Sequence, residues 1–135
     1  MIRKFEIQDK ESVLECLKEV WTIDKIEDSF LEEYLKNDNH LYVIISNNEI
    51  VGCATLHLQK KLIRNGSIAG FIEEVVIKEK YRNQNLGKKL INRLLEESIK
   101  LGCYKVTLSC FPERVNFYER CGFKNESITM RANLK

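Results

Sequence analysis

Alternating and helical patterns of apolar residues divide the first third of this chain into a strand and two helices. Residues 2–7 (IRKFEI) alternate apolar and polar side chains, as a half-buried strand does. Residues 9–21 then carry apolar side chains at helical spacing, and residues 26–36 do so again after an irregular break. The pattern therefore predicts a strand followed by two helices.

The middle of the chain has the composition of strands. Residues 41–46 (LYVIIS) and 49–63 are rich in β-forming residues, and two asparagines, which tolerate the positive φ of a tight turn, separate them. We therefore expect these two strands to pair in antiparallel fashion. The stretch IRNGSIAG supplies the next break, and residues 71–77 (FIEEVVI) predict a fourth strand.

The last third predicts a long helix and three shorter elements. Residues 86–101 carry apolar side chains at a helical period, and Gly102 is placed to end that helix. Residues 104–109 (YKVTLS) predict a fifth strand. Residues 113–123 predict a short helix, and residues 127–134 (SITMRANL) predict a last strand.

Together these elements predict one α/β domain, more strictly an α+β fold, in which helices flank a mixed and mostly antiparallel central sheet. A chain of 135 residues with 44% hydrophobic residues is long enough to bury one core. Because no repeat or low-complexity tract interrupts the chain, residues 1–135 are predicted to form a single domain.

Composition excludes several classes of protein. The 22 basic and 20 acidic side chains leave a net charge of +2, which is too small to indicate a nucleic-acid partner. No stretch approaches the ~18 apolar residues of a membrane span, and the N-terminus lacks a signal peptide's apolar run. The five cysteines are odd in number and contain no CxxC pair, which disfavours a zinc site or a disulfide framework. We expect a cytoplasmic protein with reduced thiols and no metal.

The stretch YRNQNLGKKL places a tight turn between a predicted strand and the long helix. Such a turn gathers backbone N–H groups at one point, where the helix dipole also favours negative charge. Arg82, Lys88 and Lys89 add positive charge. Gly87 allows a ligand to approach the backbone closely. The stretch predicts a phosphate site, and an ordinary helix start with solvated lysines is the alternative interpretation of this motif alone.

The segment from Arg82 to Gly87 resembles the R/Q-x-x-G-x-G/A signature of the GCN5-related N-acetyltransferases, the GNAT superfamily, which bind the pyrophosphate of acetyl-CoA there. Asn85 stands where that signature has its first glycine. Asparagine adopts left-handed backbone more readily than other non-glycine residues, so we expect the turn to keep its form.

Within the superfamily, the chain resembles the small eukaryotic glucosamine 6-phosphate N-acetyltransferases over nearly its whole length. The matching blocks follow the family's order and spacing: TI at Thr22, LQKKLIRNG, GFIEEVVI, the turn, GCYKVTLSC, NFYERCGF and the terminal ITM. The resemblance implies the GNAT fold and direct acetyl transfer from acetyl-CoA to the amine of D-glucosamine 6-phosphate, for UDP-N-acetylglucosamine synthesis. It also implies a homodimer with shared active sites.

The same resemblance implies which residues bind each ligand. For acetyl-CoA they are Val75, Val76, Arg82, Asn83, Gln84, Asn85, Leu86, Gly87, Lys88, Phe117 and Tyr118. For the sugar phosphate they are Thr22, Lys60, Lys61, Leu62, Ile63, Ile72, Glu73, Glu74, Tyr104, Lys105 and Arg131, some of them from a second subunit. The family's phosphate-binding arginine falls at Asn133 here, and Arg131 would share one face of a strand with that position.

The implied reaction needs a base for the amine and a proton donor for the leaving thiolate. Glu73 or Glu74 is the candidate base, and we expect only one in the site because adjacent strand residues point to opposite faces. Tyr118 is the candidate acid, since a tyrosine with an ordinary pKa of about 10 is protonated at pH 7. On the residues alone, Tyr118 is equally well explained as a core residue. His40 and His57 are too far apart in sequence to predict a metal site or a hydrolytic triad.

Two other hypotheses remain open. Ser109 and Arg114 stand where the family usually has an acidic residue and an asparagine, which favours a GNAT enzyme for another amine, such as a peptide N-terminus, a lysine or a polyamine. Asn85 in the turn favours a non-enzymatic module that binds acetyl-CoA. A screen of acceptor amines separates these hypotheses, because a polyamine site should be acidic and a phosphosugar site basic.

Overall fold

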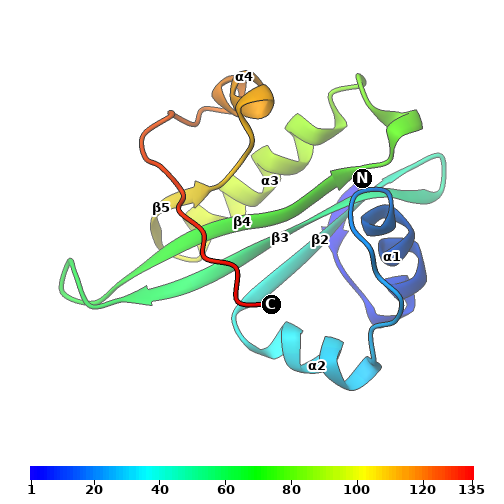
Figure 1. Ribbon diagram of the computed structural model, residues 1–135, viewed down its shortest axis with the longest axis horizontal. Helices are drawn as coiled ribbons and strands as arrows, with labels where there is room; N and C mark the ends of the chain where they lie inside the picture. The colour runs from blue at the N-terminus through cyan, green and yellow to red at the C-terminus, as the bar shows by residue number, and fades with distance from the viewer.

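Five strands form one sheet in which spatial order follows sequence order (Figure 1). A computed structural model describes residues 1–135. The strands are β1 (Ile2–Lys4), β2 (Asn39–Ser46), β3 (Glu49–Lys61), β4 (Ser67–Ile77) and β5 (Cys103–Leu108). Every neighbouring pair is antiparallel except β4 with β5, which is parallel. The predicted mixed, mostly antiparallel sheet is therefore confirmed.

Four α-helices and three 3₁₀ turns complete the fold, and the last turn and helix follow β5. The helices are α1 (Lys10–Lys18), α2 (Asp28–Lys36), α3 (Leu86–Lys100) and α4 (Val115–Arg120). The 3₁₀ turns are η1 (Ile7–Asp9), η2 (Glu79–Tyr81) and η3 (Pro112–Arg114). The first strand and the first helix are shorter than predicted. The helix ends early because Val20 and Trp21 are 52% and 44% exposed and do not pack in a core.

The sheet is buried on both faces, which produces two separate cores. Leu90, Ile91 and Leu94 of α3 pack on one face, and Val13 and Cys16 of α1 pack on the other. Successive residues of β2 belong to alternate cores, since neighbouring strand side chains point to opposite faces. Because both faces of β2 are buried, its sequence is a continuous apolar run rather than an alternating one.

Local turn chemistry follows the sequence closely. Asn47 and Asn48 have φ values of 51° and 62°, the left-handed conformations that a two-residue hairpin turn needs. Helix α3 begins at Leu86 as predicted, and Gly102 follows it with a φ of +84°. Asparagine and glycine are favoured over other residues in the left-handed backbone conformation that Asn47, Asn48 and Gly102 adopt.

The predicted strand at 127–134 is wrong. Residues 124–135 have no regular structure, and in Figure 1 this segment ends the chain as an extended tail. Ile128, Met130 and Leu134 are 89%, 91% and 92% exposed. The sequence of the tail does alternate as a strand would. A strand must also pair with the edge of another strand, and no strand of this single chain pairs with the tail.

A bidentate ion pair fastens β1 to the start of α1. The Arg3 guanidinium donates to both carboxylate oxygens of Asp9, at 2.7 and 3.0 Å, and the Glu6 backbone N–H donates to Asp9 Oδ2 at 2.8 Å. The hydrogen bonds from Arg3 lower the pKa of Asp9 against the opposing effect of burial. Asp9 is only 6% exposed, so the pair is screened less than a surface pair.

Asp9→Asn is expected to lower the free energy of unfolding by about 1–3 kcal/mol at pH 7. Because the folded-state pKa of Asp9 lies below the unfolded value, its contribution is full above the unfolded pKa and is lost as the pH falls through the folded pKa. The difference between variant and parent should therefore shrink toward pH 3 in urea unfolding. Asp28→Asn is the control, since Asp28 pairs with Lys10 but its side chain is 68% exposed. Equal losses in both variants would contradict the account.

Candidate active site

Strands β4 and β5 separate part-way along their length. Their pairing ends at Ile72 opposite Leu108, whereas β4 continues to Ile77. Figure 1 shows β4 running on toward α3 while the chain leaves β5 for α4. Val75 packs toward the α3 core and Val76 is buried in the α1 core. Their backbone groups on the open side therefore have no strand partner, and an extended ligand can pair with them.

A β-bulge interrupts β4 in this open stretch. Thr55 lies opposite Glu73, yet Cys53 lies opposite Val76, so that two residues of β4 face one residue of β3. Glu74 occupies the bulge with a φ of 56°, which is uncommon for a residue other than glycine. A strained backbone at such a position is typical of functional sites.

The bulge brings both acidic side chains to one place, so the prediction that they point to opposite faces of the strand is wrong. A carboxylate oxygen of Glu73, one of Glu74 and a ring nitrogen of His57 all lie within 4.8 Å of one another. Alternation of faces holds only for regular strand backbone, and the left-handed Glu74 breaks it. Both glutamates are exposed to solvent.

His57 and Tyr34 complete this acidic cluster, and sequence reasoning found neither. His57 Nε2 lies 3.0 Å from Glu73 Oε1. The Tyr34 hydroxyl lies 3.1 Å from Glu74 Oε1 and 2.9 Å from Thr55 Oγ1, so it can donate to the carboxylate and accept from the threonine. Burial raises the pKa of Tyr34, which keeps the hydroxyl protonated. The sequence could have placed His57 near Glu73 only if the register between the two predicted strands that carry them had been known.

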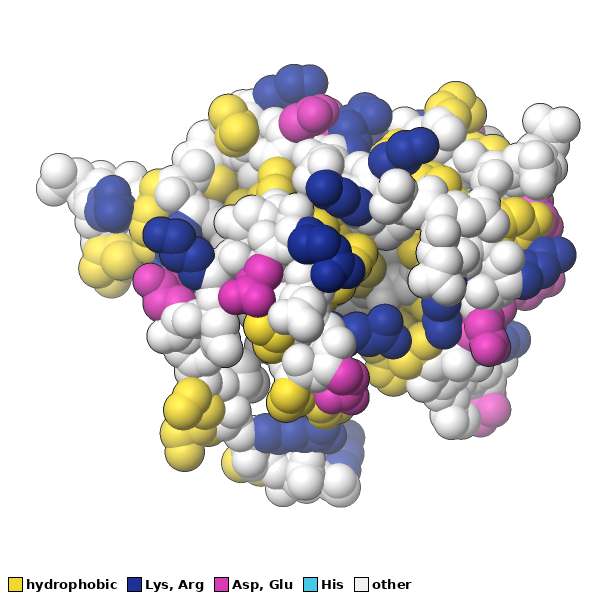
Figure 2. Space-filling model, turned by 90° about the horizontal axis from the view of Figure 1, so that it is seen from above, with side chains coloured by type: hydrophobic (Ala, Val, Ile, Leu, Met, Phe, Trp, Pro, Cys, Tyr) yellow, Lys and Arg dark blue, Asp and Glu magenta, His cyan; other side chains and the backbone are white.

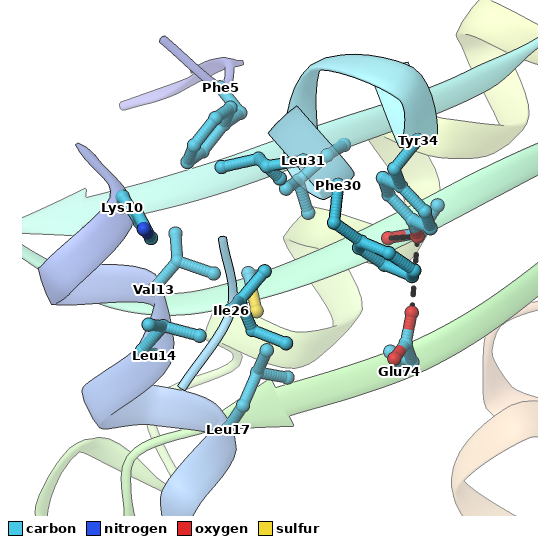
Figure 3. Close-up of a pocket in the computed structure, with 13 residues that line it drawn as sticks. Phe5, Lys10, Val13, Leu14, Leu17, Ile26, Phe30, Leu31, Tyr34 and Glu74 are labelled. Carbon is cyan, nitrogen blue, oxygen red and sulfur yellow. Dashed lines mark hydrogen bonds between the residues drawn. The ribbon is translucent and has the colours of Figure 1, made fainter. Parts of the chain in front are cut away.

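An apolar pocket of about 100 Å³ lies behind Glu74. Figure 3 shows side chains from α1, α2 and the sheet around it, with the Tyr34 and Glu74 contact at one edge. Its lining is mostly hydrophobic and includes Phe5, Val13, Leu14, Leu17, Ile26, Phe30, Leu31 and Leu41. A carboxylate beside such a wall needs hydrogen-bond partners, which Tyr34 supplies.

The turn before α3 has the geometry of an anion site. Asn85 takes the left-handed conformation expected of it, with a φ of 62°. The first helical hydrogen bond runs from the Lys89 N–H to the Asn85 carbonyl, so the N–H groups of residues 86–88 have no intrahelical acceptor. The Arg82 side chain donates to the Ile77 carbonyl at 2.9 Å, which joins the turn to the end of β4. Asn83, Gln84 and Lys88 are exposed around it.

Gly87 leaves room at this turn that a side chain would fill. A Cβ there would lie 3.1 Å from the Phe117 ring and 3.7 Å from Ile77. Helix α4 thus approaches the start of α3 across the gap between β4 and β5. Figure 2 shows Lys and Arg side chains gathered around a hollow on the face that carries α3 and α4. Free amides, basic side chains and close backbone access fit the diphosphate of acetyl-CoA.

Tyr118 lies next to this region on α4. Its ring packs edge to face with Phe117, with centroids 4.9 Å apart, and with Phe123 at 5.9 Å. Burial raises the pKa of Tyr118 to about 12. The hydroxyl is therefore fully protonated at neutral pH and suited to donate a hydrogen bond to a departing thiolate rather than to give up its proton completely.

The residues predicted to bind a sugar phosphate are not brought together by one chain. Lys61 pairs with Ser67 at the far end of β3, six residues beyond the Thr55–Glu73 pair, or about 20 Å along the strand. Lys60, Leu62 and Ile63 share that end, and Tyr104 lies there under the Arg64 guanidinium at 4.4 Å. Thr22 is exposed between α1 and α2, Lys105 is exposed on β5, Ile72 is buried, and Arg131 lies in the tail.

This chain is similar to known proteins both in sequence and in structure. A family model described as Acetyltransferase (GNAT) family matches residues 8–123. The chain belongs to the GNAT acetyltransferase family. A curated relative, the glucosamine 6-phosphate N-acetyltransferase of Arabidopsis thaliana, is 36% identical over 138 residues, covering 96% of this chain and 93% of the relative.

Two crystal structures extend the similarity to three dimensions. Glucosamine-6-phosphate N-acetyltransferase from Arabidopsis thaliana superposes with a TM-score of 0.91 at 33% identity, covering 100% of this chain and 98% of that one. An acetyltransferase from Trypanosoma brucei superposes with a TM-score of 0.93 at 33% identity, covering 99% of each chain. The predicted GNAT fold is thereby confirmed. None of the helices of this GNAT chain has the length and apolar character needed to cross a membrane.

Proposed function

We propose that this GNAT enzyme transfers the acetyl group of acetyl-CoA to the 2-amino group of D-glucosamine 6-phosphate, giving N-acetylglucosamine 6-phosphate for UDP-N-acetylglucosamine synthesis in the cytoplasm. The observation that carries the proposal is the relative of that name, which matches over 96% of the chain. The paired carboxylates at the β4 bulge support it, since they can receive an ammonium group beside the opened strand edge.

Each step of direct transfer has a candidate group in this chain. Glu73 accepts a proton from the ammonium, and Glu74 helps to hold the charge in place. Backbone N–H groups at the β4 bulge are candidates to polarise the thioester carbonyl, an effect worth about 3 kcal/mol per donor. Tyr118 donates to the departing sulfur. No cysteine nucleophile is required, because the amine attacks the thioester itself.

The site is proposed to be shared between two copies in a homodimer. Lys61 lies about 20 Å along β3 from the level of Glu73, which is too far for one small sugar phosphate to touch both. Leu62 is 97% exposed and Ile63 is 61% exposed at the tip beyond it. The apolar tail residues add to an uncovered surface that a second copy can bury.

Thiol release with a panel of amines tests the proposal. Turnover is expected with glucosamine 6-phosphate, and Lys61→Ala is expected to raise its KM about 10-fold or more by removing a charge-assisted contact to phosphate. Lys124→Ala, which changes an exposed lysine outside both predicted ligand sets, is the control. The proposal is overturned by turnover with unphosphorylated glucosamine, a peptide or a polyamine but not with the phosphosugar. Acetyl-CoA binding without any transfer would indicate a non-enzymatic module.

Tyr118→Phe is expected to lower kcat about 10-fold while the KM for acetyl-CoA changes little. The substitution removes one hydrogen bond to a charged sulfur and leaves the ring packing against Phe117 and Phe123 intact. Because burial raises the pKa of Tyr118 to about 12, the parent enzyme should show no loss of rate from this group below about pH 11. A variant with unchanged kcat under single-turnover conditions would remove Tyr118 from the mechanism.

A further inference from the structure

His57 is held on both sides by groups from the neighbouring strands. Asn39 lies directly opposite it on β2, and Asn39 Oδ1 contacts His57 Nδ1. On the other side, His57 Nε2 lies 3.0 Å from Glu73 Oε1 of β4. The imidazole is 19% exposed, so these contacts rather than water occupy both ring nitrogens.

Asn39 determines which nitrogen of His57 carries a proton. Its side-chain Nδ2 donates to the Tyr34 backbone carbonyl at 2.9 Å, which fixes the orientation of the amide and turns Oδ1 toward His57. An amide oxygen only accepts hydrogen bonds, so His57 Nδ1 must donate. Neutral His57 therefore carries its proton on Nδ1 and directs the lone pair of Nε2 at Glu73.

A lone pair and a carboxylate cannot form a hydrogen bond unless a proton lies between them. The contact between His57 and Glu73 is therefore built to hold one additional proton. The other titratable groups that face the imidazole are Glu74 from β4 and Tyr34 from α2, whose ring centroid is 6.0 Å away. Phe71 of β4 also packs near it and carries no charge. The charged groups closest to His57 are therefore carboxylates.

We infer that His57 is the positioning residue of the base, and that it holds, through Glu73, the proton that the acceptor ammonium loses. This inference rests on the proposed function. The ammonium gives one N–H proton to Glu73, which passes it to His57 Nε2 and becomes a carboxylate again. The amine then forms its bond to the acetyl carbon as the carbon–sulfur bond breaks, and its second proton goes to the departing sulfur. The His57 imidazolium returns its proton to water by way of Glu73, whose side chain is 51% exposed, so one proton is released per turnover.

The protonation of His57 can be measured without any substrate. The chain has two histidines, so long-range proton–nitrogen NMR spectra contain His57 and one internal reference, His40. Neutral His57 at high pH is expected to carry its proton on Nδ1, and Asn39→Ala is expected to remove that preference. A proton on Nε2 in the parent protein would overturn the inference. Because no acceptor is present, this result does not depend on the proposed function.

The pH dependence of kcat/KM separates proton holding from packing. His57→Gln is expected to lower kcat/KM for the phosphosugar at pH 7 about 10- to 100-fold, with the loss shrinking at high pH, where the amine arrives already neutral. His40→Gln is the control and should match the parent. A loss in His57→Gln that is the same at every pH indicates a packing role and overturns the inference. If no turnover with the phosphosugar is found at all, the proposed function fails, and the NMR result alone decides on His57.

Discussion

Glu73→Gln is expected to lower kcat/KM about 100- to 10,000-fold, which is the range for removing a general base. The substitution keeps the shape of the side chain and its exposed position on β4, but the amide cannot accept the ammonium proton. It also leaves His57 Nε2 without the carboxylate that lies 3.0 Å away. Initial rates of thiol release at saturating acetyl-CoA measure the loss.

Glu96→Gln is the matched control for that experiment, since it makes the same change at an exposed position of α3 away from the acidic cluster. Parent-like activity in this control shows that the loss in Glu73→Gln is local. If Glu73→Gln retained more than about a tenth of the parental kcat/KM, Glu74 or a water molecule would have to be the base.

Gly87→Val is expected to weaken acetyl-CoA binding about 10- to 100-fold. A Cβ at this position already lies 3.1 Å from the Phe117 ring, and a branched side chain must displace that ring or cover the free amides at the start of α3. The expected loss corresponds to about 1.4–2.8 kcal/mol of binding free energy, since each 1.4 kcal/mol is about tenfold in affinity. Titration calorimetry with acetyl-CoA measures the change directly.

The helix itself should tolerate Gly87→Val, because valine has a higher helix propensity than glycine. Asn92→Val is the control, at an exposed position of the same helix. The two variants are expected to melt within a few degrees of the parent, while only Gly87→Val loses affinity. Equal affinities in the two variants would show that the cofactor does not approach Gly87.

The parts of the structure that local chemistry determines were predicted correctly. The left-handed Asn85 and the start of α3 at Leu86 follow from turn and helix preferences within a few residues. The same holds for Gly102 after that helix and for the asparagine turn between β2 and β3. The left-handed Asn85 and the start of α3 lie at the proposed diphosphate site, so the prediction of that site rests on local chemistry.

The parts that depend on register or on a partner were not predicted. The contact of Glu73 with His57 requires the pairing of β3 with β4 and the bulge at Glu74, and no local pattern encodes either. Tyr34 reaches Glu74 from a helix 40 residues earlier in the chain. The tail at 127–134 has the alternation of a strand, but its apolar side chains lack a surface within one chain. The residues proposed for the cofactor include Gly87 and Phe117, which lie close together in one chain, whereas Lys61 lies far along β3 from Glu73.

The most direct test of the account is an NMR titration of the protein with coenzyme A. The account predicts that amide resonances from Arg82 to Lys88 and from the part of β4 that does not pair with β5, residues 73–77, move together and saturate with one ligand per chain. Resonances at the β3–β4 hairpin, residues 62–66, should stay in place. If the amides of the turn remain unmoved while coenzyme A binds elsewhere, the assignment of this site is contradicted.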